Sequence, residues 1–319
     1  MKKRNIIIAM VLAMAMTTVG GATVFAADEK AEGNDYTIAY VPTTMNNPFW
    51  TAMMGGIKEE MEAKGMDVDK QLVTVDANSD QATMNNYVND LIAQQVDAII
   101  LAPMDCTAVT EALTACEEAG IPVINVDTAV DATDKVVSII ASDNYKAGVE
   151  CAEEMMSKLD KGAKIAVMNQ PSGTACVQRE KGFLDTAGDY FEIVSTTDTE
   201  GDTAKTMTAA EDVLTADDDL AGFFCINDMG ALGCVQAAQA AGKEDLLIYG
   251  VDGNPDFMGY VADGSATASA AQQPSVIGQK ALDAAIDTLD GKEVEHDQVV
   301  DVVLSNKDNI ADFDVTDLQ

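Results

Sequence analysis

The chain has 319 residues, 47% of them hydrophobic, which is enough for two domains of ordinary size. Its formal net charge of −35 at pH 7 argues against a basic surface that could hold a nucleic-acid backbone. We therefore expect no nucleic acid among its partners, and we interpret the acidity as a source of solubility and mutual repulsion.

The N-terminal segment has the pattern of a secretory signal peptide. A basic stretch at residues 2–4 precedes an apolar run at residues 6–16, which is too short to span a bilayer. Residues 24–26 (VFA) fit the small-x-small rule for cleavage, so we predict a signal peptide over 1–26 and a flexible leader over 27–35. The first cysteine is Cys106, so no N-terminal lipid anchor is expected and the location should be periplasmic or secreted.

Residues 36–50 (YTIAYVPTTMNNPFW) predict a strand, a polar loop and the start of a helix. The β-branched and aromatic run 37–41 is typical of a buried strand, and Pro42 ends it. Asn47 is the expected cap of a helix that begins at Pro48. The adjacent Phe49 and Trp50 have two interpretations: core residues of the first helical turn, or aromatic walls of a ligand site.

The rest of the chain alternates between strands and helices. Strands are expected at 72–75, 96–101, 121–126, 136–141, 164–168, 191–196, 221–226 and 246–251, with a late strand at 299–304. Helices are expected at 79–95, within 103–120, and at 145–159, 176–187, 203–215, 229–241 and 275–289. This alternation predicts parallel sheets with right-handed crossovers. Because it occurs in two series that break near residues 141–144, we expect two doubly wound α/β lobes.

The six cysteines predict buried free thiols rather than a metal site. None forms a C-x-x-C pair, and the only histidine is His296, so no zinc site is expected. One disulfide remains an alternative, and the spacing does not select its partners.

Four polar residues share one topological place. Asn47, Asp127, Asn227 and Asp252 each follow a predicted strand directly, or after a short loop. The carboxyl ends of parallel strands are where open α/β sheets bind ligands, and carboxylate and amide groups suit vicinal hydroxyls. The alternative for each residue is a helix N-cap, because a helix follows.

Signals for catalysis are weak. The chain has no G-x-G-x-x-G, Walker or G-x-S-x-G motif. A Ser-His-Asp triad would have to use His296, and Asp127 with Asp252 could act as an acid/base pair only at a suitable separation. We therefore expect a protein that is not an enzyme and has no cofactor.

Eight motifs together resemble one known family. They are MNNPFW (45–50), DAIILAP (97–103), IPVINVDT (121–128), VVSIIASDN (136–144), R-x-x-G-F (179–183), FFCINDMGALG (223–233), GVDGNPD (250–256) and AAQQPSVIG (270–278). In them the chain resembles the type I periplasmic sugar-binding proteins of ABC transporters, in the ribose-binding branch, over about residues 36 to 305.

The resemblance implies two lobes joined by a three-crossover hinge. The N-terminal lobe would comprise residues 36–141 plus 273–302, and the C-terminal lobe 142–272 plus 303–319. A monosaccharide would lie between them. The ligand-binding residues that it implies are Asn47, Phe49, Trp50, Asp127, Arg179, Asn227, Asp252 and Gln272. The two aspartates and the arginine would make charge-assisted hydrogen bonds to hydroxyls, and the three amide side chains would each offer a donor and an acceptor. The two aromatic residues would stack on the sugar ring. The implied partner is the membrane permease of an ABC transporter, and the protein is expected to be a monomer.

Two positions depart from the ribose-binding pattern. Thr128 stands where that branch has an arginine, and Gly201 or a neighbour stands where it has a phenylalanine. A hexose, a polyol or a sugar-like signal such as the furanosyl autoinducer is therefore as good an expectation as ribose. The alternative role is sensory, in which the protein presents its ligand to a membrane chemoreceptor.

Overall fold

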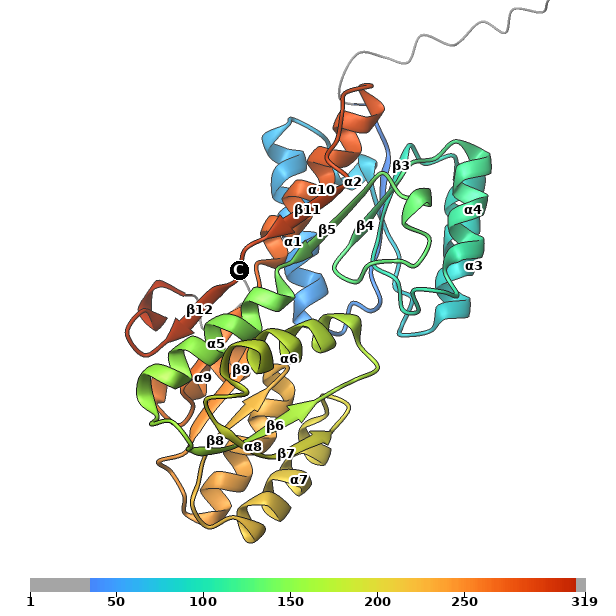
Figure 1. The fold of residues 1–319 in the computed structure, drawn as a ribbon. Helices are drawn as coiled ribbons and strands as arrows, with labels where there is room; N and C mark the ends of the chain where they lie inside the picture. Colours follow the sequence, from blue (N-terminus) through green and yellow to red (C-terminus); the bar gives the residue numbers. More distant parts are fainter. Residues whose placement is uncertain (1–34, 314–319) are drawn as a thin grey trace, which may run out of the picture. The chain divides into compact units, whose positions relative to one another are not determined.

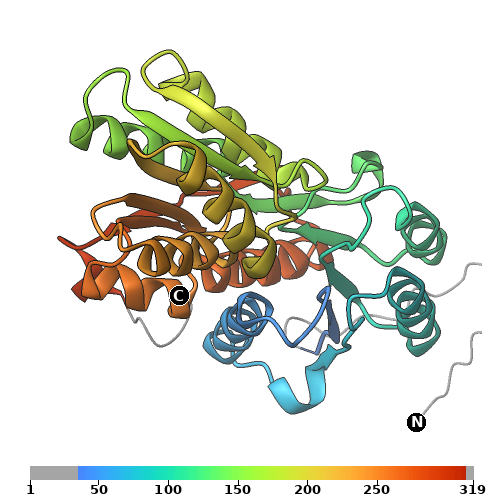
Figure 2. The same cartoon turned by 90° about the horizontal axis from the view of Figure 1, so that it is seen from below.

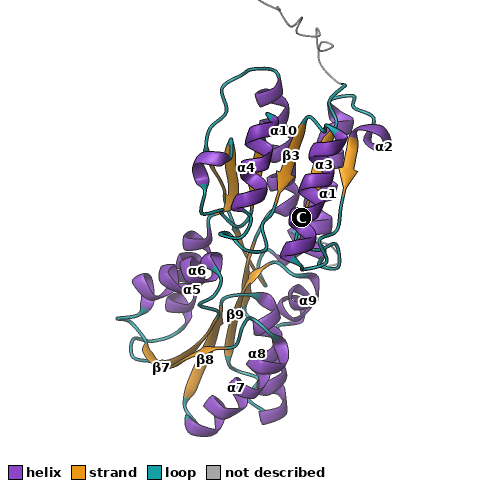
Figure 3. Ribbon diagram, turned by 90° about the vertical axis from the view of Figure 1, so that its right-hand side faces the viewer, coloured by secondary structure: helices purple, strands orange, loops and turns teal. Residues whose placement is uncertain are grey.

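The computed structural model describes residues 35–313, and these form two six-stranded sheets. Figures 1 and 3 show how the helices are arranged around them. The first sheet has the order β11-β5-β4-β3-β1-β2 and is parallel throughout. Its strands are β1 (Ile38–Val41), β2 (Leu72–Thr74), β3 (Ala98–Leu101), β4 (Val123–Val126), β5 (Ser138–Ser142) and β11 (Asp297–Val300). The predicted signal peptide lies outside the described residues.

The second sheet has the order β12-β10-β9-β8-β6-β7. Its strands are β6 (Lys164–Asn169), β7 (Glu192–Asp198), β8 (Leu220–Cys225), β9 (Leu247–Asp252), β10 (Ala268–Ala271) and β12 (Val303–Asn306). Only β12 runs antiparallel among the described strands, where it pairs with β10. The predicted class, two doubly wound and mainly parallel lobes, is confirmed.

Helices cover both faces of each sheet. The first lobe carries α1 (Pro48–Ala63), α2 (Val68–Gln71), α3 (Gln81–Gln94), α4 (Thr110–Ala119) and α10 (Pro274–Leu289). The second carries α5 (Asn144–Lys158), α6 (Thr174–Ala187), α7 (Thr203–Ala216), α8 (Asp228–Ala241) and α9 (Pro255–Asp263). Short 3-10 turns occupy Thr133–Lys135 and Ile310–Asp312. Within residues 35–313, no helix has the length and apolar character needed to cross a membrane.

Alternating residues of each strand supply two separate cores. In β1, Ile38 and Tyr40 pack with α1 and α10, whereas Ala39 and Val41 pack with α3 and α4. Figure 2 shows α10 beside α1, on the opposite side of the first sheet from α3 and α4. Because both of their faces are buried, the central strands β1, β3 and β8 are nearly continuous apolar runs.

The chain passes between the two sheets three times: from β5 to α5, from β10 to α10, and from β11 to β12. The prediction of one late strand at 299–304 was wrong. Val300 pairs with Ser142 in the first sheet, whereas Val303 pairs with Ala271 in the second. Residues 301–302 form the third crossover, and the exposed Asp301 interrupts the apolar run 299–304 at that point.

Candidate functional site

All eight predicted ligand residues line one cavity of about 570 Å³. It lies at the carboxyl ends of β1, β3 and β4 of the first sheet and of β6, β8, β9 and β10 of the second. The predicted residues in its wall are Asn47, Phe49, Trp50, Asp127, Arg179, Asn227, Asp252 and Gln272. The volume is within the range of about 300–1,000 Å³ that is usual for small-molecule sites.

The opening loop supplies an amide and two aromatic rings. Asn47 caps α1 as predicted, because its side chain accepts a hydrogen bond from Phe49 N at 2.9 Å. The rings of Phe49 and Trp50 meet edge to face with centroids 4.9 Å apart, and Tyr40 Oη donates to Trp50 O at 3.1 Å. Both rings are buried in the first core and also line the cavity, so the two interpretations offered for them are compatible.

Asp127 is held at the end of β4 by its own loop. Its backbone has φ 64°, a left-handed conformation that is uncommon for a residue with a side chain, and no helix follows it directly. Thr128 Oγ1 donates to Asp127 Oδ2 at 2.8 Å. The fully buried Asn125 donates to Leu101 O and Thr128 O and accepts from Val130 N, which fixes this loop. The N-cap alternative therefore fails for Asp127, and Thr128 lines the cavity beside it.

Arg179 makes three hydrogen bonds to three separate segments. Its Nη1 donates to Asp252 Oδ1 and to Ile226 O, each at 2.9 Å, and its Nε donates to Asn144 Oδ1 at 2.8 Å. The residue is 4% exposed, so the pairing with Asp252 largely compensates a buried charge. Because Asn144 begins α5 directly after the first crossover, Arg179 also links the cavity wall to that crossover.

Gln272 joins the cavity to the second crossover. Its Nε2 donates to Asp252 Oδ1 at 2.8 Å, and its backbone N donates to Asp252 O at 3.1 Å. Gln272 Oε1 has no hydrogen-bond partner among the described residues, although the side chain is 4% exposed. A buried acceptor without a partner is costly, and a donor from a ligand would satisfy it.

Gly201, which stands at or beside the place where the ribose-binding pattern has a phenylalanine, does not line the cavity. Its φ of 63° is left-handed, and a Cβ there would lie 2.5 Å from Asn227 Nδ2 and 2.8 Å from Gln170 Oε1. Asn227 Nδ2 donates to Gly201 O at 3.2 Å, while Asn227 Oδ1 caps α8 by accepting from Gly230 N. The backbone of Gly201 therefore holds the amide of Asn227 in place. Asn227 is both the N-cap of α8 and a residue of the cavity wall.

Further wall residues have no counterpart in the predicted set. They are Pro103, Met104, Cys106, Gln170, Ser172, Gly173, Thr174, Ala175, Cys176, Met229 and Asn254. Most lie one to six residues past a strand end, so a wider search of those loops would have found them. All six cysteines are free thiols; Cys106 and Cys176 are partly exposed, and the other four are buried.

The cavity carries little charge. Among its described wall residues, Asp127 and Asp252 are the acids and Arg179 is the one cation. Burial raises the pKa of Asp127, while Thr128 and Arg179 oppose that shift. Burial likewise raises the pKa of Asp252, against the lowering effect of Arg179 and Gln272. A site of this kind repels a free anion and offers acceptors to hydroxyl groups.

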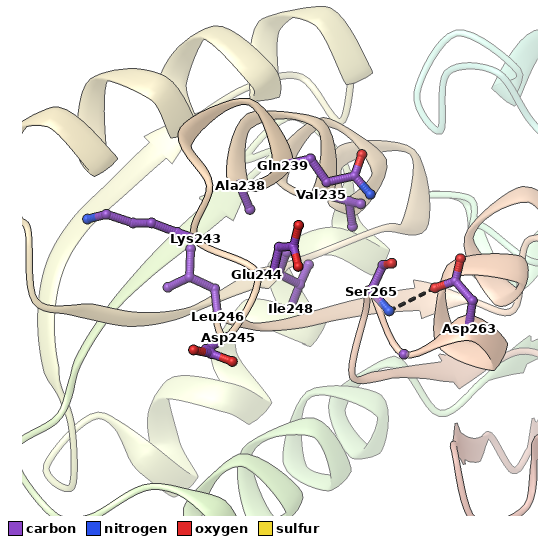
Figure 4. A pocket seen from close by; sticks show the side chains of 11 residues that line it. Val235, Ala238, Gln239, Lys243, Glu244, Asp245, Leu246, Ile248, Asp263 and Ser265 are labelled. Carbon is purple, nitrogen blue, oxygen red and sulfur yellow. Dashed lines mark hydrogen bonds between the residues drawn. The ribbon is translucent and has the colours of Figure 1, made fainter.

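The remaining candidate features lie elsewhere. His296 bonds to Asp297 and to Thr133 O and is not part of the cavity wall, so the triad alternative has no support at this site. A second cavity of about 520 Å³ lies at the carboxyl end of α8 and the amino end of β9, near Lys243 and Asp263 (Figure 4). It contains none of the predicted ligand residues and lies at the strand ends where parallel sheets do not usually bind ligands.

Comparison with known proteins agrees with this geometry. A family model described as "Periplasmic binding protein domain" matches residues 38–293. The ribose import binding protein of Bacillus subtilis is 36% identical over 262 residues, covering 82% of this chain and 84% of the relative. The Escherichia coli ribose import binding protein is 33% identical over 270 residues, covering 84% and 90%.

A solved structure shares the fold. It is an ABC transporter periplasmic solute-binding protein from Actinobacillus succinogenes with bound D-allose, which is 27% identical with a TM-score of 0.79. The match covers 87% of this chain and all of the solved chain. The chain therefore belongs to the periplasmic binding protein family, in the branch that contains the ribose import binding proteins.

Proposed function

We propose that this protein captures a neutral monosaccharide or polyol in the cavity between its two sheets and delivers it to the membrane permease of an ABC transporter. The observation that carries the proposal is the convergence of eight polar and aromatic residues from distant segments on one cavity, where Gln272 Oε1 receives no hydrogen bond from the part of the chain that the structure describes. Hydroxyl groups supply a donor for this oxygen. The protein is a binding protein and not an enzyme, as are its relatives.

The charges of the cavity favour a neutral ligand. The guanidinium of Arg179 is already engaged by Asp252, Ile226 O and Asn144, so a ligand phosphate or carboxylate would compete with these partners. Two carboxylates against one cation also disfavour an anion. Sugar hydroxyls can donate to Asp127 and Asp252, and can accept from Asn47 and Asn227.

The rings of Phe49 and Trp50 give the site an apolar wall. A pyranose or furanose has a C–H face that packs on such a wall while its hydroxyls reach the polar side. We assign these two residues to ring contact and the six polar residues to hydroxyl recognition.

We extend the proposal to the location of the protein, its oligomeric state and the boundaries of its lobes. The relatives are import binding proteins, so we assign delivery to a permease rather than presentation to a chemoreceptor, and a periplasmic or exported location. We propose a monomer with lobes at 36–142 plus 273–302 and at 143–272 plus 303–319, where the first boundary lies one residue later than expected because Ser142 ends β5 of the first sheet. Residues 314–319 lie outside the described residues.

The test is a ligand screen on sugar-stripped protein. The panel contains D-ribose, D-allose, D-galactose, myo-inositol and xylitol, with L-glutamate and adenine as controls. A ligand that binds only the folded state stabilises it by about 2.7 kcal/mol at a hundredfold excess over Kd. Each kcal/mol raises the melting temperature by about 2–4 °C in domains of this size, so a true ligand gives a shift of several degrees.

We expect one or two of the neutral compounds to lead clearly, with D-ribose not the strongest, because Thr128 replaces a bidentate donor. Trp50 is the only tryptophan of the chain and lies in the cavity wall, so its fluorescence reports binding directly. A clear lead for D-ribose would restore the ribose assignment. A response to glutamate or adenine alone would overturn the carbohydrate assignment.

A further inference from the structure

Asp228 lies directly behind the cavity and does not line it. It is the first residue of α8, and it is fully buried, whereas its neighbour Asn227 reaches the cavity wall. A buried carboxylate normally needs a hydrogen-bonded environment, and its partners indicate what it stabilises.

The partners of Asp228 are the backbone of one turn and one serine. Asp228 Oδ2 accepts from Asn254 N at 2.6 Å. Ser269 Oγ lies 2.8 Å from Asp228 Oδ1 and 3.0 Å from Oδ2, and it accepts from Gly253 N at 3.1 Å. Asp228 and Ser269 thus satisfy two consecutive backbone N–H groups.

Those two N–H groups belong to the turn that carries Asp252. Asp252 has φ 131° and Gly253 has φ 78°, so the turn is held in a region that non-glycine residues rarely adopt. Strain of this kind persists only where surrounding contacts over-determine it. Arg179 and Gln272 hold Asp252 itself, and the hydrogen bonds to Asp228 and Ser269 hold the two residues that follow it.

Gly250 in β9 shows how closely the Asp228 carboxylate packs against that strand. A Cβ on Gly250 would lie 2.1 Å from Asp228 Oδ1, so only glycine at that place in β9 leaves room for the carboxylate. Asp228 also lies near Asp252, and burial together with that neighbour raises the pKa of Asp228 to about 8. In its neutral form it supports the turn without adding a second negative charge beside Asp252.

We propose that Asp228 and Ser269 are positioning residues of the ligand site, which hold the Gly253–Asn254 turn and thereby set the direction of the Asp252 carboxylate. This rests on the proposed function, in which Asp252 binds a hydroxyl of the sugar. Neither residue touches the ligand itself.

The first test is a double-mutant cycle on affinity for D-ribose and D-allose, measured by Trp50 fluorescence. We expect Ser269→Ala to weaken binding about 10-fold in the wild-type background and less than about 2-fold in an Asp252→Asn background, because coupled residues act non-additively. Equal losses in both backgrounds would show that Ser269 acts independently of Asp252 and would overturn the proposal.

The matched control is Ser305→Ala. Ser305 is the strand partner of Ser269 and is equally buried, but its hydroxyl has no hydrogen-bond partner within residues 35–313. We expect it to bind both sugars like wild type. The conservative Asp228→Asn variant keeps an acceptor for Asn254 N, so it should bind within about 3-fold of wild type, whereas Asp228→Ala should lose as much as Ser269→Ala.

The second test needs no sugar. Crystal structures of the unliganded Ser269→Ala and Ser305→Ala variants should differ at Asp252: the contact between Asp252 Oδ1 and Arg179 Nη1 is lost in the first and kept in the second. An unchanged Asp252 in both would overturn the proposal. If wild type binds no compound of the panel, the proposed function fails while this comparison still decides the positioning role.

Discussion

Gln272 Nε2 and Arg179 Nη1 both donate to the same oxygen, Asp252 Oδ1, at 2.8 and 2.9 Å. Asp252 is therefore the point at which the second crossover and α6 meet. Because all three residues line the cavity, Asp252 is the central acceptor of the proposed site.

Asp252→Asn should weaken sugar binding about 10- to 150-fold, since a hydrogen bond to a charged group contributes about 1.5–3 kcal/mol. Asparagine keeps the shape, and so limits the loss of stability beside the buried Arg179. Isothermal titration checks the value, with the exposed Asp256→Asn as the control. An unchanged Kd for Asp252→Asn would remove this residue from the site.

Arg179→Lys should lower both affinity and melting temperature. A lysine keeps the charge but has no planar fork, so it cannot serve Asp252, Ile226 O and Asn144 together. Thermal denaturation and titration are performed on Arg179→Lys and on the control Lys181→Arg, an exposed change on the same helix. A variant that melts early but binds normally would mark Arg179 as structural only.

Gly201→Ala and Gly242→Ala form a matched pair. Both glycines have left-handed φ, 63° and 68°, so both alanine variants should lose stability, and the close contacts of a Cβ at 201 should make the loss larger there. A Cβ at 201 approaches Asn227 Nδ2, whereas nothing lies within 4 Å of one at 242. Only Gly201→Ala should therefore weaken sugar binding, and equal affinities of the two variants would contradict the supporting role of Gly201.

The protonation of Asp228 should be visible in stability. Burial and Asp252 raise its pKa to about 8, so the folded state binds a proton that the unfolded state releases near its ordinary pKa. The free energy of unfolding contributed by this group therefore falls as pH rises between about 4 and about 8. The Asp228→Asn variant has no ionisable group at this position and therefore lacks this pH dependence.

Urea denaturation of wild type and Asp228→Asn over this pH range provides the measurement. The stability of the variant relative to wild type should increase with pH. A difference that stays constant across the range would show that Asp228 ionises normally in the folded protein.

Much of this fold was accessible from sequence because the strands are buried on both faces and the helices have clear periodicity. The missed elements have weak local signals. β10 consists of alanine and serine, residues with little preference for strands, and it is a strand only because β9 and β12 flank it. α9 follows Asn254 and Pro255, a capped start that was noted only as part of a motif.

Only part of the predicted site followed from the residues themselves, and the rest followed from the resemblance to a family. Strand-end position identified Asn47, Asp127, Asn227 and Asp252, but Arg179 and Gln272 came from family resemblance. The residues that support the site were not predicted, because their contacts come from segments that are distant in the sequence. Asp228 sits beside Asn227 in sequence, yet its partners come from β10 and from the turn after β9.

The packing of α10 has a consequence for the order in which the molecule forms. Ser275 Oγ donates to Ala52 O, a partner 223 residues earlier, and Ile277 and Leu282 close the apolar face that α1 shares. A growing chain therefore makes β6 to β10 of the second lobe before α10 can complete the first lobe. Contacts this distant in sequence also slow folding. The first lobe of a newly made chain thus stays incomplete until α10 is present, a property that would suit the exported location that we propose.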